Sequence, residues 1–285
     1  MSDAIERIEW KDLGVERFDA KFGKPLKPVI VKGAIDHWQA RGKWTPDFFR
    51  KKHGDREVTV DGMRWKLGSL IDKIEGSSLT STAPYLRNEL LDKWPKTLRE
   101  DVSPIPLCTQ GNWLEAPSHH WLRRWLSPEL YIGGAGAKFP VLHYDQFHLH
   151  AFLMQLYGDK EYLVYAPNQL NYMYRGEGEL ENKSMVNDPE NPDLSRFPGF
   201  AIAKGFRFRL HPGETLFVPC GWWHTAKILS TSITVSLNGV SSSNWKEFSD
   251  DLVQDISRDS LIGGYKTRVR LAITNWRQSN SQKWQ

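Results

Sequence analysis

The sequence predicts a mainly β fold with flanking helices, in which two sheets roll up into a double-stranded β-helix, or jelly roll. Three observations support this prediction. Short apolar or alternating runs, each bounded by Gly, Pro or Asp, recur through the middle of the chain. Two segments with side chains suited to a metal site, residues 143–145 and 221–224, lie far apart among these runs. A double-sheet jelly roll can bring such distant turns together.

The composition is that of an ordinary globular protein. Hydrophobic residues make up 40% of the 285 residues and charged residues 25%. A β-barrel with flanking helices reaches this length as one unit, so we predict a single domain over residues 1–285. We expect an N-terminal α/β flank (1–125), a jelly-roll core (126–243) and a C-terminal helical tail (244–285).

Charge and cysteine content limit the cellular compartments and the kinds of partner that we expect. With 38 basic and 34 acidic residues the net charge is +4, too balanced to favour a nucleic-acid partner without a clustered patch. The two cysteines, Cys108 and Cys220, form no C-x-x-C pair, and the polar N-terminus is unlike a signal peptide. No apolar run reaches the length of a membrane span. We therefore predict a cytoplasmic protein without a membrane partner. If the source is a eukaryote, the nucleus is an alternative location.

The flank should combine strands and helices. Thr45 followed by Pro46 is typical of a helix start, with Thr at the cap and Pro in the first turn. Asp61-Gly62 between two short runs predicts a β-hairpin. The predicted elements of the flank are a strand at 27–32, a helix from 45, hairpin strands at 56–60 and 63–67, and helices at 69–75 and 118–125.

The core should be rich in strands. Its predicted strands are 130–133, 139–144, 151–157, 160–165, 206–210, 214–218 and 233–238. The strict alternation of the last one predicts a half-buried strand. Residues 168–204 form a long polar insertion, and loops of this length are often lids or binding loops.

The tail is predicted to be helical from residue 244 to about 276. Phe248, Leu252 and Ile256 recur at four-residue spacing and form an apolar stripe along this helix. The stripe has two interpretations that stay open, a packing face within the chain or a contact in a homodimer.

His143, Asp145 and His224 are the candidate catalytic residues. Side chains two apart in an extended segment point to the same side, so His143 and Asp145 can converge on one ion. Two histidines and one carboxylate hold one face of a divalent metal and leave the other open, as in non-haem Fe(II) oxygenases. His224 follows Trp222 and Trp223, which should pack into a cavity wall. An H-x-D tripeptide is common, however, and a strand-end histidine beside a surface aspartate is the simpler interpretation.

Several motifs together resemble a known family. They are Lys27-Pro-Val-Ile-Val, Asp36-His37-Trp38, Lys43-Trp44-Thr45, His143-Tyr-Asp145, Gln155-Leu-Tyr-Gly158-Asp-Lys160 and Pro219-Cys-Gly-Trp-Trp-His224. On these motifs, over about residues 27–238, the chain resembles the JmjC or cupin-like Fe(II)/2-oxoglutarate-dependent oxygenases. It is most similar to their small hydroxylase branch, which includes the asparaginyl hydroxylase of hypoxia-inducible factor. The resemblance implies a cupin/JmjC-type jelly roll, bound Fe(II), and 2-oxoglutarate and O2 as cosubstrates.

The resemblance also implies roles for six residues. Three would ligate iron and three would bind 2-oxoglutarate: His143, Asp145 and His224, and Lys160, Tyr85 and Asn238. A dicarboxylate in a buried barrel needs a cation at its far end, because an unpaired buried charge is costly, and Lys160 would supply it. Taken without the resemblance, Lys160 is equally a surface hairpin lysine, Tyr85 a packing tyrosine and Asn238 a strand-end turn residue.

The chain departs from the family pattern at two places. Lys160 lies 17 positions beyond His143, where many relatives have 15, so two extra residues fall in the stretch that contains His148 and His150. In an unbroken strand these histidines would face away from the metal, whereas a bulge would turn them toward the substrate mouth. A threonine that often lies three residues before the first ligand is Pro140 here, so its hydrogen bond is missing or supplied by another residue.

The predicted activity is hydroxylation of a protein or peptide side chain, with release of succinate and CO2. The long insertion and the 13 tryptophans suggest a groove that could hold an extended chain. Three alternatives stay open: a 2-oxoglutarate oxygenase that acts on a small molecule or an RNA base, a cupin-type metal enzyme that does not use 2-oxoglutarate and recruits His148 or His150, and a binding protein without turnover.

Overall fold

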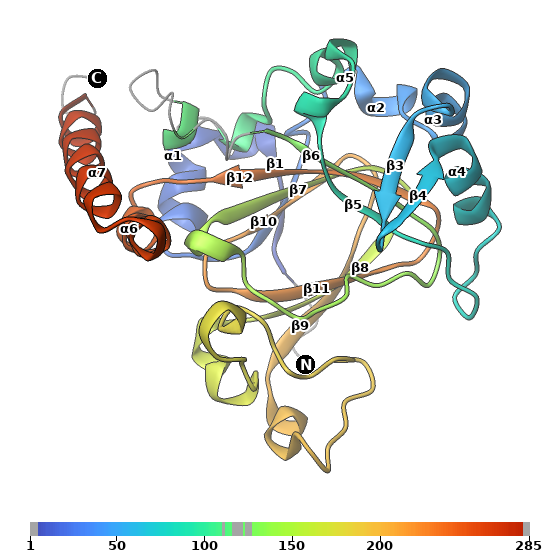
Figure 1. Ribbon diagram of the computed structural model, residues 1–285. Helices are drawn as coiled ribbons and strands as arrows, with labels where there is room; N and C mark the ends of the chain where they lie inside the picture. Colours follow the sequence, from blue (N-terminus) through green and yellow to red (C-terminus); the bar gives the residue numbers. More distant parts are fainter. Residues whose placement is uncertain (1–4, 110–111, 116–121, 123–126, 282–285) are drawn as a thin grey trace.

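Two sheets that face each other form the centre of the protein (Figure 1). The computed structural model describes residues 5–109, 112–115, 122 and 127–281. The larger sheet has seven strands in the order β1-β2-β10-β7-β12-β6-β5, and the smaller has three in the order β11-β8-β9. All neighbours in both sheets are antiparallel except β1 and β2. Consecutive strands such as β7 and β8 lie in different sheets, and the predicted jelly roll is confirmed.

The larger sheet contains β1 (Arg7–Glu9), β2 (Val29–Lys32), β5 (Leu86–Leu90), β6 (Glu129–Gly133), β7 (His150–Tyr157), β10 (Glu214–Val218) and β12 (Ser232–Gly239). The smaller contains β8 (Lys160–Tyr165), β9 (Gly205–Leu210) and β11 (Trp223–Ile228), and a separate hairpin contains β3 (Glu57–Val60) and β4 (Met63–Lys66). The helices are α1 (Gly14–Phe18), α2 (Ala40–Lys43), α3 (Pro46–His53), α4 (Leu67–Glu75), α5 (Lys96–Asp101), α6 (Trp245–Asp259) and α7 (Leu261–Ser281).

The local signals in the N-terminal flank produce the predicted elements. Thr45 caps α3, because its side-chain oxygen accepts a hydrogen bond from the Phe48 N–H at 3.1 Å. Asp61 and Gly62 both have positive φ, 48° and 79°, as the tight turn between β3 and β4 requires. The predicted helix at 118–125 lies outside the described residues, apart from Leu122.

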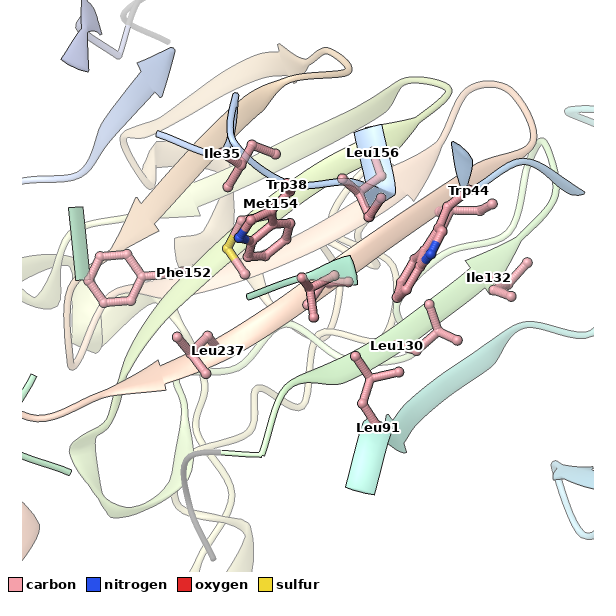
Figure 2. Close-up of a cluster of buried hydrophobic side chains, with 14 of the residues drawn as sticks. Ile35, Trp38, Trp44, Leu91, Leu130, Ile132, Phe152, Met154, Leu156 and Leu237 are labelled. Atoms are coloured by element: carbon pink, nitrogen blue, oxygen red, sulfur yellow. The ribbon is translucent and has the colours of Figure 1, made fainter. Parts of the chain in front are cut away.

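The flank covers the outer face of the larger sheet. Every second side chain of β7 and β12 belongs to one buried apolar cluster that also contains Trp38 and Trp44 of the flank. Figure 2 shows part of this cluster, with both tryptophans among the labelled residues. The sheet residues in this layer include Phe152, Met154 and Leu156 of β7 and Ile233, Val235 and Leu237 of β12. This apolar layer fixes the orientation of both strands, so the alternate side chains must point into the barrel.

The inner face of β6 and β12 is polar. Thr234, Ser236 and Asn238 of β12 and Glu129 and Tyr131 of β6 line a cavity of about 580 Å³ inside the barrel. The prediction of a half-buried strand at 233–238 is therefore wrong: all of it is buried except the partly buried Asn238. The alternation reflects an apolar face under the flank and a polar face toward an internal cavity, not toward bulk solvent.

The predicted strand at 139–144 does not form. The segment makes only isolated bridges, among them one between His143 and His224. Pro140 has no N–H to donate to a ladder, which interrupts regular pairing. The segment is nevertheless extended enough to place its alternate side chains on one side, as the H-x-D interpretation requires.

The long insertion is attached to the barrel. It contains the short 3-10 turns Pro167–Tyr172, Gly178–Leu180 and Pro198–Ile202. Its residues 182–184 run beside residues 142–144: the Tyr144 N–H donates to the Asn182 carbonyl at 3.0 Å, and the Ser184 N–H to the Leu142 carbonyl at 2.8 Å. The insertion thus supports the segment that carries two predicted metal ligands.

The tail forms α6 and α7 at one end of the barrel (Figure 1). Phe248 and Leu252 are fully buried against the chain, and Ile256 is partly buried beside them. This stripe is therefore a packing face within the chain, one of its two predicted roles. Among the helices that the structure describes, none combines the length and hydrophobicity needed to cross a membrane.

Candidate metal centre and its cavity

His143, Asp145 and His224 meet at one point. Their ligand atoms all lie within 4.8 Å of one another. One carboxylate oxygen of Asp145 is 3.9 Å from His143 Nε2, and the other is 3.8 Å from His224 Nε2. The fold thus brings together two imidazoles and a carboxylate from residues 143–145 and β11, as predicted.

Backbone contacts orient both imidazoles. His143 Nδ1 lies 3.1 Å from the Val141 carbonyl, and His224 Nδ1 lies 3.0 Å from the Trp222 carbonyl. An Nδ1–H that donates to a carbonyl leaves the Nε2 lone pair free, and this is the usual support for a metal-binding histidine. The two backbones also exchange hydrogen bonds, His143 N–H to His224 carbonyl at 3.1 Å and the reverse at 2.6 Å. Main-chain hydrogen bonds therefore help to fix the distance between the two histidines, in addition to the contacts of their side chains.

The electrostatics of the three residues favour a bound cation. Burial, together with the charge of His224, lowers the pKa of His143 to about 3, so its imidazole is neutral at physiological pH. Burial raises the pKa of Asp145 even though His224 opposes the shift, because a carboxylate inside the barrel has lost water. A divalent ion would stabilise the carboxylate and would bind the Nε2 lone pairs of the two histidines directly, so the donor set fits a metal.

Asn182 holds the residue between the two ligands of the H-x-D segment. Besides the backbone hydrogen bond to Tyr144, its side-chain Nδ2 donates to the Tyr144 carbonyl at 2.8 Å, and Asn182 is only 6% exposed. Both polar groups of the Tyr144 backbone are thus occupied by one residue of the insertion. Sequence reasoning missed Asn182, because nothing in the local pattern pairs residue 182 with residue 144.

Asn182→Ala should weaken metal binding, because the His143–Asp145 segment loses a side-chain support. Loss of such an outer contact typically costs about 10- to 100-fold in metal affinity. Titration with Co(II), followed by its visible absorption, measures the affinity without turnover. Asn187→Ala, at an exposed site of the same insertion, is the matched control and should bind as the wild type does. Unchanged Co(II) affinity in Asn182→Ala would contradict this role.

Lys160 and Tyr85 meet inside the same cavity. Lys160 Nζ donates a hydrogen bond to the Tyr85 hydroxyl at 2.9 Å, and the two residues are 2% and 7% exposed. No carboxylate of the described residues lies within ion-pair distance of Lys160, and burial lowers its pKa to about 7. A buried ammonium without a counter-ion indicates a place for an anionic ligand.

One cavity contains every predicted site residue. The three candidate ligands, Lys160, Tyr85 and Asn238 all line the space of about 580 Å³. Asn238 contributes its side chain to this wall, while its backbone carbonyl accepts a hydrogen bond from Asn112 Nδ2 at 2.8 Å. A 2-oxoglutarate molecule, with a carboxylate for Lys160 and a keto acid end for a metal, matches the chemistry of this wall.

Four other predicted residues do not reach the cavity. His148 pairs with Asp251 of α6 at 2.7 Å, and buried His150 accepts a hydrogen bond from the Cys220 N–H at 3.0 Å. Phe147 and His148 have positive φ, so the chain is kinked there, but the kink does not turn His148 or His150 toward the cavity. Trp222 and Trp223 are buried in two separate hydrophobic clusters, not in the cavity wall.

Glu129 and Tyr131 also line the cavity and were missed. They alternate with the outward-facing Leu130 and Ile132 along β6. This alternation of polar and apolar residues in the sequence could have indicated them. It gave no sign that the polar face points inward.

Comparisons with known proteins identify relatives of this chain. A family model described as a cupin-like domain matches residues 15–248. The chain is 29% identical over 248 residues to a lysine-specific demethylase 8 of Xenopus tropicalis, covering 82% of this chain and 52% of that protein. It is 26% identical over 243 residues to a tRNA wybutosine-synthesizing protein 5 of Gallus gallus, covering 78% and 73%.

A third relative joins two activities in its name. It is a bifunctional arginine demethylase and lysyl-hydroxylase of Caenorhabditis elegans, 24% identical over 260 residues, which cover 85% of this chain and 62% of that protein. The chain spans about half the length of several relatives, among them the lysine-specific demethylase 8. The similarity to those proteins therefore concerns only the part of each that corresponds to the barrel and its flank.

Proposed function

This chain belongs to the cupin-like domain family, and on that premise we propose that it is an Fe(II)- and 2-oxoglutarate-dependent oxygenase that hydroxylates a side chain of a protein or peptide. One observation carries the proposal: a His-Asp-His cluster and a buried lysine without a counter-ion line the same cavity. The first suits a divalent metal with open positions, and the second suits a dicarboxylate.

The protein side chains hold and orient the reactants. His143, Asp145 and His224 would ligate Fe(II) through the two Nε2 atoms and the carboxylate. When bound, iron with 2-oxoglutarate and O2 supplies oxidation of a C–H bond to C–OH, with release of succinate and CO2. Each imidazole keeps its position because its Nδ1–H donates to a backbone carbonyl.

Lys160 and Tyr85 would bind the distal carboxylate of 2-oxoglutarate with an ammonium and a phenol. Asn238 would contact the cosubstrate from β12. Apolar residues such as Leu153, Ala151 and Ala226 complete the wall and keep water from the reacting groups. The support for these roles is the placement of all these side chains around one cavity.

Two measurements test the proposal. Anaerobic addition of Fe(II) and 2-oxoglutarate should give a weak visible absorption band that neither gives alone. Admission of O2 should then produce succinate in proportion to the 2-oxoglutarate consumed. A protein that binds metal but shows neither the band nor oxygen-dependent succinate would instead be a metal enzyme or binding protein of another kind.

A protein or peptide substrate is favoured by two of the relatives, whose names refer to lysine and arginine residues. A small molecule and an RNA base are the alternative substrates. The RNA base is retained because one relative is a tRNA wybutosine-synthesizing protein. A screen of peptide pools, metabolite extracts and RNA, read by mass spectrometry, separates them. A gain of one oxygen that requires 2-oxoglutarate identifies hydroxylation, whereas loss of a methyl group identifies demethylation.

We also propose a homodimer contact on the second tail helix. Ile262 and Tyr265 of α7 are each 70% exposed, and Val269 and Ile273 continue this apolar strip at 42% and 47%. Ile262→Glu combined with Tyr265→Glu should convert a dimer to a monomer in light scattering coupled to size exclusion, because charge on an apolar contact is costly. A wild-type monomer at high concentration, or an unchanged dimer in the variant, would contradict this contact.

A further inference from the structure

Phe139 lies beside a candidate metal ligand, and the roles above do not use it. Its ring centre is 4.6 Å from that of the His143 imidazole, and the two ring planes are inclined by only 18°. Phe139 is partly buried and lines the same cavity as His143 and His224. Stacked aromatic rings at this separation attract each other, so the contact can hold the imidazole in one plane.

A bulge in the chain before the H-x-D segment produces this contact. Lys138 bridges to Lys227 of β11, and His143 bridges to His224 of the same strand. Five positions separate 138 from 143, but only three separate 224 from 227, so two extra residues are accommodated between the bridges. The chain bends at residues 140–141. An unbroken strand would hold side chains four positions apart at about 13 Å, whereas the bulge brings the two rings together.

The backbone of Phe139 is fixed to β11, the strand that carries His224. The Phe139 N–H donates to the Ala226 carbonyl at 2.8 Å, and the Phe139 carbonyl accepts from the Thr225 hydroxyl at 3.2 Å. The Arg87 guanidinium also lies 5.9 Å from the centre of the Phe139 ring, within the range of a cation–π contact. The ring is therefore a fixed surface at the cavity wall.

The imidazole of His143 is the less enclosed of the two candidate ligands. Its side chain is 14% exposed, against 7% for His224. The contact of Nδ1 with the Val141 carbonyl fixes one edge of the ring but leaves the ring free to tilt about that hydrogen bond. A tilt would turn Nε2 away from the point where the three ligands meet. A flat aromatic side chain against the imidazole opposes this tilt and covers the ring from water.

From the bulge and the stacked rings together, we infer that Phe139 is a positioning residue of the metal centre, which fixes the plane of the His143 imidazole and hence the direction of its Nε2 lone pair. The inference rests on the proposed function and adds a residue that the ligand roles do not include. A ligand that is already held in its binding orientation loses less conformational freedom when the metal binds, which raises the affinity.

Proton NMR of the metal-free protein tests the contact itself. An imidazole stacked on a phenyl ring has its ring protons shifted upfield, and the His143 signals can be assigned from their loss in His143→Gln. Phe139→Leu keeps an apolar side chain without a ring and should move these signals downfield. Phe139→Tyr keeps the ring and should leave them at the wild-type positions.

Titration with Co(II) then tests the effect on the metal centre without turnover. Phe139→Leu should bind Co(II) about two- to tenfold more weakly, as expected for the loss of one aromatic contact, and the visible band should shift because one ligand is reoriented. Phe139→Tyr should restore both the affinity and the band. Phe48→Leu is the matched control and should behave as the wild type does, because the Phe48 ring also contacts a histidine, His53 at 5.7 Å, but does not line the cavity.

Two results would overturn the inference. One is a Phe139→Leu protein that keeps the wild-type Co(II) affinity and visible band, even if it unfolds at a lower temperature, since that is the behaviour of a residue that only packs. The other is a set of His143 signals that does not move in Phe139→Leu. Failure of the proposed function would look different, because the wild type itself would then bind no Co(II), and the inference would fall with it.

Discussion

His224→Ala should reduce both metal binding and oxygen-dependent succinate formation to background. His224 is 6% exposed, and its Nε2 is 3.8 Å from Asp145, so no other described histidine can take its place. Its removal leaves one imidazole and one carboxylate, which is too few ligands for a tightly held Fe(II) with open positions. Because the backbone hydrogen bonds between residues 143 and 224 do not involve the imidazole, β11 should remain paired.

Two readouts distinguish a lost metal site from a lost fold. Co(II) should raise the thermal unfolding midpoint of the wild type and leave that of His224→Ala unchanged, because an ion that binds only the folded state stabilises it. His37→Ala, at an exposed histidine in the flank, is the control and should retain the Co(II) effect. A His224→Ala protein that still binds Co(II) with wild-type affinity would remove the basis for the metal centre.

The parts of the fold that could be predicted are those set by local chemistry. Thr45-Pro46 and Asp61-Gly62 specify a cap and a turn through their own backbone preferences, and both form as expected. His143 and Asp145 could be paired because a separation of two residues in an extended chain has a fixed geometry. His224 is a candidate from its position directly after two tryptophans, whereas Lys160 needs the family resemblance, because its spacing alone carries little information.

The features that could not be predicted depend on contacts between segments that are distant in the sequence. The alternation at 233–238 fixes two faces but does not say that one meets the flank and the other an internal cavity. The contact of Asn182 with Tyr144 joins residues 38 positions apart through an irregular insertion, for which no periodicity exists. The parity of His148 and His150 applies only to an unbroken strand, and only the fold shows that the chain is kinked there and that these histidines pair with Asp251 and Cys220.

Lys160→Met should raise the 2-oxoglutarate concentration required for turnover, and this effect separates the proposed oxygenase from a metal enzyme that does not use 2-oxoglutarate. Loss of one partner of a buried charged hydrogen bond typically costs about 2 kcal/mol or more, which corresponds to at least about 30-fold in Kd. Lys66→Met, at an exposed lysine of β4, is the control and should leave the Kd for 2-oxoglutarate unchanged. Metal binding should be normal in both variants.

Stability should not fall with this substitution. Burial lowers the pKa of Lys160 to about 7, which means that the folded protein disfavours its charged form. Methionine has a similar length and no charge to desolvate, so Lys160→Met should unfold at the same temperature as the wild type or higher. A large drop in the midpoint would indicate that Lys160 stabilises the barrel, not the cosubstrate.

The same lowered pKa gives 2-oxoglutarate binding a defined pH dependence. In the free protein Lys160 loses its proton above about pH 7, whereas a bound carboxylate must raise its pKa because it stabilises the ammonium. Binding above pH 7 therefore takes up a proton, and the affinity should fall by up to about tenfold per pH unit from pH 7 toward pH 9. Calorimetric titrations in two buffers of different ionisation enthalpy should show uptake that approaches one proton in the wild type and none in Lys160→Met. A Kd that is flat from pH 7 to pH 9 in the wild type would mean that this amine is not the group that binds the carboxylate.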